Sequence, residues 1–140
     1  MLYFGKITVR LKNRGERGGN MVLDLNVSIR ENNNIPVIDL EGEIDVYTYP
    51  KLSDALQYVF ETYPNAKDLI VNLDKIRYID STGLGVIANG ANQIKKINEG
   101  YINIINATPQ IKKIFDVSGL ISANFKIFDS EEDAVTNLSK

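Results

Sequence analysis

The stretch Tyr-Ile-Asp-Ser-Thr-Gly-Leu-Gly-Val, residues 78–86, stands between the two elements that decide the fold. Before it, residues 69–73 form a short, nearly continuous apolar run, which predicts a central strand buried on both faces. After it, apolar residues recur with the period of a helix. The inward stripe of this helix is expected to consist of Leu84, Ile87, Ala88, Ala91, Ile94 and Ile97. A strand that leads into a helix in this way is typical of an α/β sheet.

The flanking segments continue the alternation of strands and helices. Strands are expected at residues 22–30, 36–40, 69–73, 101–105 and 125–128, and helices at residues 49–63, 81–100, 108–119 and from 130 onward. The first two strands are separated by a polar cluster with three consecutive Asn, which predicts an antiparallel hairpin. We therefore expect an α/β fold, with a mostly parallel sheet of about five strands and an antiparallel N-terminal hairpin, packed against about four helices.

The predicted helices carry signals for their first and last residues. Thr48, Thr108 and Ser130 stand where N-caps are expected. Gly100 and Gly119 stand where the second and third helices should end. A glycine inside the second helix, Gly90, is costly in a helix, and either a close helix contact or a partner surface would explain it.

The composition excludes several classes of protein. With 140 residues, the chain is long enough for one domain with a single core. It contains neither Cys nor His, so it lacks thiol nucleophiles, thiolate metal ligands and the commonest general base. We expect no enzyme, no metal and no cofactor. Lys6 and Arg10 interrupt any N-terminal apolar stretch, so we expect a cytoplasmic protein without a signal peptide or membrane span.

Charge separates residues 1–20 from residues 21–140. The first segment holds five basic residues and one acidic residue, a net charge of +4, so the remainder carries −6 of the total of −2. An acidic body disfavours direct nucleic-acid binding. The basic segment could be a nucleic-acid or membrane arm, but we expect a disordered tail or a start-site artefact with Met21 as the true start. Residues 21–140 are then the folded domain.

The glycines of residues 83–88 allow three interpretations. Gly-Leu-Gly-Val-Ile-Ala fits a dinucleotide-binding fingerprint. Asn106 stands where such a site needs an acid, and no room is left for a second mononucleotide half, so this interpretation is disfavoured. Alternatively, Gly83 and Gly85 allow a close approach to a neighbouring strand. In the third interpretation they leave the hydroxyl of Ser81 uncovered, so that another protein can reach it.

Ser81 itself is predicted at the start of a helix, where an N-cap is the plainest role. A phosphate is also tolerated there, because a helix N-terminus favours an anion. It would add a charge of about −1.5 to −2 beside Asp80 and Asp45 and so repel a partner. A catalytic serine is disfavoured because the chain has no His and no G-x-S-x-G, and Lys75 is the only Lys nearby in the sequence.

A run of four acidic residues precedes the first predicted helix: Asp39, Glu41, Glu43 and Asp45. Their spacing places them on one face of an extended strand. They could bind Mg²⁺ or supply an acid–base pair, but a solvated strand face is the favoured interpretation. We expect Asp45 to belong to a partner-binding surface.

Three stretches resemble the anti-sigma factor antagonists, which are single STAS domains. They are residues 42–45, Gly-Glu-Ile-Asp; the motif at residues 78–86; and residues 109–120, in the third predicted helix. The resemblance covers about residues 22–138, and residues 1–20 have no counterpart in it.

The resemblance implies a function. An unphosphorylated antagonist binds an anti-sigma factor that is also a serine kinase, and so releases a sigma factor. The kinase would phosphorylate Ser81, and a separate serine phosphatase would restore it. The partner-binding residues implied here are Asp45, Asp80, Thr82, Gly83, Leu84 and Gly85. The alternative is a non-enzymatic STAS subunit of a larger stress-sensing or membrane-associated complex.

Overall fold

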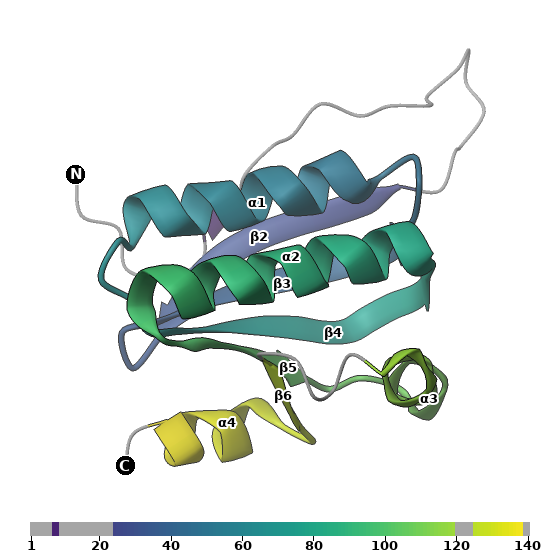
Figure 1. Cartoon of the computed structure of the whole chain (residues 1–140). Helices are drawn as coiled ribbons and strands as arrows, with labels where there is room; N and C mark the ends of the chain where they lie inside the picture. Colours follow the sequence, from purple (N-terminus) through teal and green to yellow (C-terminus); the bar gives the residue numbers. More distant parts are fainter. Residues whose placement is uncertain (1–6, 9–23, 120–124, 139–140) are drawn as a thin grey trace.

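A six-stranded sheet forms the centre of the protein. A computed structural model describes residues 7–8, 24–119 and 125–138 (Figure 1). The strands are β1 (Ile7–Thr8), β2 (Leu25–Asn32), β3 (Ile35–Ile44), β4 (Asp68–Ile79), β5 (Tyr101–Ile105) and β6 (Phe125–Phe128), and they lie in the sheet in chain order. The neighbours β1–β2 and β2–β3 are antiparallel, and all later pairs are parallel.

Five of these strands and the antiparallel hairpin were predicted and are confirmed. The additional strand, β1, comes from the segment at residues 1–20, where no strand was predicted, and it pairs with Ile29 and Ser28 of β2. The remaining predictions for the N-terminal segment, including Met21 as the true start, lie outside the described residues.

Four helices cover the sheet, as predicted: α1 (Tyr49–Thr62), α2 (Ser81–Asn98), α3 (Pro109–Ser118) and α4 (Glu131–Leu138). Helices α1 and α2 lie side by side on one face, whereas α4 lies on the opposite face (Figure 1). In the part of the chain that the structure describes, no helix is both long and apolar enough to span a bilayer.

The core has two parts because β4 is buried on both faces. Leu69, Val71 and Leu73 of β4 belong to the main cluster, which also takes up the apolar stripes of α1 and α2. Ile70 points the other way, into a smaller cluster that includes Ala134 of α4. The apolar run therefore forms the predicted central strand, although β4 continues beyond it to Ile79.

Several predicted turn and cap residues have the expected geometry. Asn33 and Asn34 in the hairpin turn have φ of 51° and 66°, the left-handed conformation. Thr108 and Ser130 accept hydrogen bonds from backbone N–H groups in the first turns of α3 and α4. Gly119 ends α3 with φ of 75°. Local side-chain chemistry therefore defines these helix ends.

Two predictions about α2 need correction. Ile97 was placed in the inward stripe but is 57% exposed, because in the last turn of α2 it is Asn98 that faces the protein and donates to the carbonyls of Pro64 and Ala66. The left-handed residue at the end of α2 is Glu99, with φ of 57°, and not Gly100. Gly100 instead allows close chain contact, since a Cβ there would lie 1.2 Å from the carbonyl oxygen of Lys67.

Gly90 is explained by a close contact between helices. A Cβ at this position would lie 3.0 Å from Leu56 Cδ1 on α1 and 3.3 Å from Ile102 Cδ1 on β5. Gly90 is buried, so of the two explanations left open by the sequence the packing contact is the one observed.

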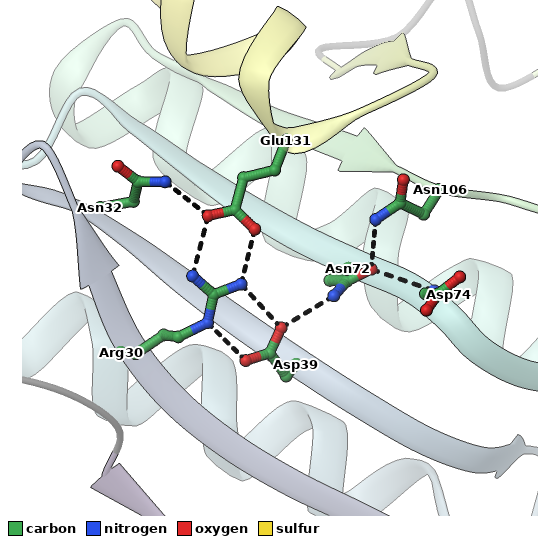
Figure 2. A network of polar contacts seen from close by, with 7 residues as sticks. All are labelled: Arg30, Asn32, Asp39, Asn72, Asp74, Asn106 and Glu131. Atoms are coloured by element: carbon green, nitrogen blue, oxygen red, sulfur yellow. Dashed lines mark hydrogen bonds and ion pairs between the residues drawn. The ribbon is translucent and has the colours of Figure 1, made fainter.

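A polar network attaches α4 to the hairpin (Figure 2). Arg30 on β2 donates hydrogen bonds to Asp39 on β3, at 2.7 Å, and to Glu131 at the start of α4, at 2.6 Å. Asn32 also donates to Glu131, and Asn72 on β4 donates to Asp39. The charges are partly buried and Arg30 makes charge-assisted hydrogen bonds to both carboxylates, which makes these contacts stronger than an exposed ion pair.

The network makes stability dependent on pH. The hydrogen bond from Arg30 lowers the pKa of Glu131 below its ordinary value, with partial opposition from burial and further lowering by Asn32. Because the folded pKa lies below the unfolded one, Glu131 stabilises the fold above pH of about 4.5, and this contribution is lost as pH falls through the folded pKa.

We expect Glu131→Gln to reduce the free energy of unfolding by about 1 kcal/mol at pH 7, because hydrogen bonds to a charged acceptor are lost. The difference from wild type should narrow as pH falls from about 4.5 through the lower folded pKa of Glu131, since the wild-type side chain then loses its charge. Urea denaturation across this pH range measures both effects. Glu132→Gln, in the same turn but exposed, is the control and should leave stability unchanged.

Candidate functional site

Ser81 lies at the edge of the sheet where β3 and β4 end. The two strands are parallel neighbours, with Ile44 of β3 opposite Ile79 of β4. Two residues after Ile79, Ser81 begins α2, and the turn after β3 therefore lies beside the start of this helix (Figure 1). The site consists of two segments, residues 45–48 and residues 80–85, that are far apart in sequence and adjacent in space.

Asp80 joins the two segments. Its Oδ1 accepts a hydrogen bond from the N–H of Gly83, at 3.0 Å, which makes Asp80 the N-cap of α2. Its Oδ2 accepts one from the N–H of Val46, at 3.2 Å, and its own N–H donates to the carbonyl of Ile44, at 3.1 Å. One carboxylate thus fixes both the helix start and the neighbouring turn.

The cap role predicted for Ser81 therefore belongs to Asp80, because a carboxylate one residue earlier can reach the N–H of the third helical residue. Ser81 is the first residue of the helix and is exposed. Among the described residues, its hydroxyl has no hydrogen-bond partner. It is consequently accessible for chemistry by another molecule.

Asp45 holds the turn after β3. Its carboxylate accepts hydrogen bonds from the N–H groups of Tyr47, at 2.9 Å, and Thr48, at 3.0 Å. Thr48 was predicted to cap α1 but makes no side-chain cap. Its buried hydroxyl instead donates to the carbonyl of Glu43, at 2.7 Å, and accepts from the N–H of Asp45. These bonds leave the turn with little backbone freedom.

The remaining predicted site residues differ in exposure. Gly85 is exposed and Thr82 is partly exposed, whereas Gly83 and Leu84 are buried. A Cβ on Gly83 would lie 2.6 Å from Ile44 Cγ2 and 2.8 Å from Ile79 Cγ1, whereas nothing lies within 4 Å of a Cβ on Gly85. Gly83 therefore allows the helix to approach the strands, and Gly85 leaves the surface beside Ser81 open.

Neither a dinucleotide site at the glycines nor a magnesium or acid–base site in the acidic run has much support from this geometry. Gly83 and Gly85 lie inside the first turns of α2, so no glycine-rich loop precedes the helix to cradle a pyrophosphate. In the acidic run, Asp39 is bound by Arg30 on the hairpin, while Asp45 is bound by its own turn. These two carboxylates serve separate structural roles.

The exposure of apolar side chains beside the site was not predicted from the sequence. Val46, Tyr47 and Tyr78 are 54%, 72% and 48% exposed. The available signal was the position of Val46 and Tyr47, which directly follow a strand end where polar turn residues are more common.

The two glycines should respond in opposite directions to substitution. Gly83→Ala should destabilise the fold by about 1–3 kcal/mol, because its methyl group overlaps two buried isoleucines. Gly85→Ala should stabilise it by about 0.5–1 kcal/mol, because Ala favours the helix and the space is open. Chemical denaturation of both variants tests this, and equal effects would contradict the packing described.

Comparison with known proteins agrees with the fold. The model of the family described as "STAS domain" matches residues 26–134. The anti-sigma-B factor antagonist of Bacillus subtilis is 34% identical over 98 residues, which cover 70% of this chain and 86% of that protein.

Two solved structures have a similar fold. The crystal structure of an anti-sigma factor antagonist from Mycobacterium paratuberculosis has a TM-score of 0.73 and 22% identity, covering 83% of this chain and 95% of that one. The Bacillus cell fate determinant SpoIIAA in the phosphorylated form has a TM-score of 0.61 and 20% identity, covering 80% and 98%. The resemblance seen in the sequence is thereby confirmed: the chain belongs to the STAS domain family.

Proposed function

We propose that this protein is an anti-sigma factor antagonist that is switched by phosphorylation of Ser81. In the unphosphorylated state it binds an anti-sigma factor serine kinase, and the sigma factor held by that kinase is released. The observation that carries the proposal is that Ser81 is exposed and its hydroxyl does not cap the helix. The preceding residue, Asp80, supplies the cap. The name of the 34% identical relative, an anti-sigma-B factor antagonist, supports it.

The chemistry belongs to the partner. The Ser81 oxygen attacks the γ-phosphorus of ATP, ADP leaves, and a base on the kinase accepts the hydroxyl proton. A separate phosphatase hydrolyses the phosphoester and restores the hydroxyl. This chain supplies only an accessible acceptor, which is consistent with a sequence that has neither His nor Cys.

Phosphorylation should change the charge of the site without unfolding it. The start of α2 favours an anion, so a phosphate on its first residue does not oppose the helix. The added charge of about −1.5 to −2 lies beside the carboxylates of Asp80 and Asp45. The partner is then repelled from a surface whose backbone stays in place.

Substitution of Ser81 tests the switch. Ser81→Ala should bind the kinase as tightly as wild type and should no longer be released by ATP, because the phosphate acceptor is gone. Ser81→Asp should bind at least about 10-fold more weakly, since it places a charge where the partner docks. Titration calorimetry with the purified kinase measures both, and Ser53→Ala on α1, also an exposed serine, is the control. Tight binding by Ser81→Asp would contradict the repulsion mechanism.

Affinity capture from the native cell, with and without ATP, identifies the partner. We expect a serine kinase that is retained with ADP and released with ATP, and phosphopeptide mapping should place the phosphate on Ser81. Phosphate on Thr82 would move the site by one residue and leave the mechanism intact. An obligate multi-subunit particle without phosphate, seen by native mass measurement, would instead favour a STAS subunit of a larger sensory or membrane-associated complex.

A further inference from the structure

Several exposed apolar side chains belong to the segments next to Ser81. In the described part of the chain, six large apolar side chains are exposed, and four of them belong to the two segments that Asp80 joins or lie within two residues of them. These four are Val46, Tyr47, Tyr49 and Tyr78, and the other two are Ile97 and Val117. We call Val46, Tyr47 and Tyr78, the most exposed of the four, the Tyr47 patch.

The Tyr47 patch lies within a few residues of the phosphate acceptor. The N–H of Val46 is 3.2 Å from the carboxylate of Asp80, the residue before Ser81. Tyr78 precedes Ser81 by three residues, a span of at most about 10 Å. It pairs across the sheet with Glu43, which leads into the turn that carries Tyr47. The backbone of each of the three residues thus lies close to the site, although the side chain of Tyr78 points to the opposite face of the sheet from its neighbour Ile79, which packs into the main core.

A protein that phosphorylates Ser81 should cover the turn that carries Val46 and Tyr47, which Asp80 holds beside the start of α2. A specific interface buries about 800 Å² on each partner, which corresponds to a disc with a radius of about 16 Å. The kinase has to bring ATP to the Ser81 hydroxyl, so its footprint includes the surface around that residue. Ile97, by contrast, lies 16 residues further along α2, a distance of about 24 Å, and falls outside the footprint.

The turn presents Tyr47 in a fixed position. The carboxylate of Asp45 accepts the N–H of Tyr47, and the Thr48 hydroxyl ties the turn to the carbonyl of Glu43. The backbone therefore loses little freedom when a partner binds. Tyrosine offers a large contact area with few rotatable bonds, and it is enriched among the residues that dominate interface affinity.

We infer that the Tyr47 patch is the affinity anchor for the anti-sigma factor kinase, with Tyr47 inserted into an apolar pocket beside the kinase's ATP site. This inference rests on the proposed function and adds to it separate roles for Ser81 and Tyr47. Ser81 decides whether the complex persists, whereas Tyr47 decides how tightly the unphosphorylated chain binds. Because Tyr47 does not take part in the phosphoryl transfer, its contact with the kinase stabilises the substrate complex and the transition state equally.

The test compares Tyr47→Ala with Ile97→Ala, using the kinase purified by the capture experiment. Tyr47→Ala should raise Kd in the presence of ADP by about 10-fold or more. In steady-state phosphorylation of Ser81 it should raise KM by a similar factor and leave kcat within about twofold, the pattern of lost uniform binding. Ile97→Ala, which also removes an exposed apolar side chain, should change neither Kd nor KM.

Tyr47→Phe should retain most of the affinity for the kinase. The thermal unfolding temperature should be the same for all three variants, because Tyr47 and Ile97 are both exposed. Wild-type affinity in Tyr47→Ala would overturn the inference and leave the Ser81 switch standing. A change in the chain's own oligomeric mass, with kinase affinity unchanged, would assign the patch to self-association and also overturn it. Failure to find any ATP-sensitive partner would remove the proposed function and the inference together.

Discussion

The carboxylate of Asp80 is the contact on which the site depends. It satisfies the N–H of Gly83 at the start of α2 and the N–H of Val46 in the turn after β3. Without it both N–H groups would lose this acceptor, and the two segments would be joined by the backbone hydrogen bond from Asp80 to Ile44 and by packing around Gly83. With one residue serving both, the serine that follows has no capping role and its hydroxyl stays accessible.

The sheet makes this contact possible. Parallel pairing of β3 with β4 brings the ends of both strands to one edge, and the absence of a side chain at Gly83 allows α2 to start directly above them. The polar network on the opposite face supports the same strands from below, because Arg30 and Asp39 join the hairpin to α4 (Figure 2). Both faces have buried apolar clusters, and on the α4 face the network of Arg30, Asp39 and Glu131 is added to the apolar contacts.

Much of the fold was predictable from the sequence because its signals are local. Apolar periodicity located β5 and β6 at the correct residues, and Thr108 and Gly119 bounded α3 correctly. Periodicity failed for Ile97, because the last turn of α2 contacts the rest of the protein through Asn98, which donates to the carbonyls of Pro64 and Ala66. A helix pattern carries no information about such a contact.

The candidate site was predictable in composition but not in detail. The spacing identified Ser81 as the start of a helix and placed Asp45 near it. It could not assign the cap to Asp80, since both residues can cap a helix and the choice depends on the approach of β3. The ion pair between Arg30 and Glu131 joins residues 101 positions apart, and no local pattern indicates such a contact.

The locked turn at Asp45 and the capped start of α2 have a consequence for timing. In the switch proposed here, a surface whose two segments are already fixed needs no conformational transition between its bound and released states, so those states would differ in chemical composition and not in fold. The lifetime of each state would then be set by the rates at which a phosphate is added to Ser81 and removed from it. Those rates are properties of other proteins, and the cell can alter them without any change in the stability of this one.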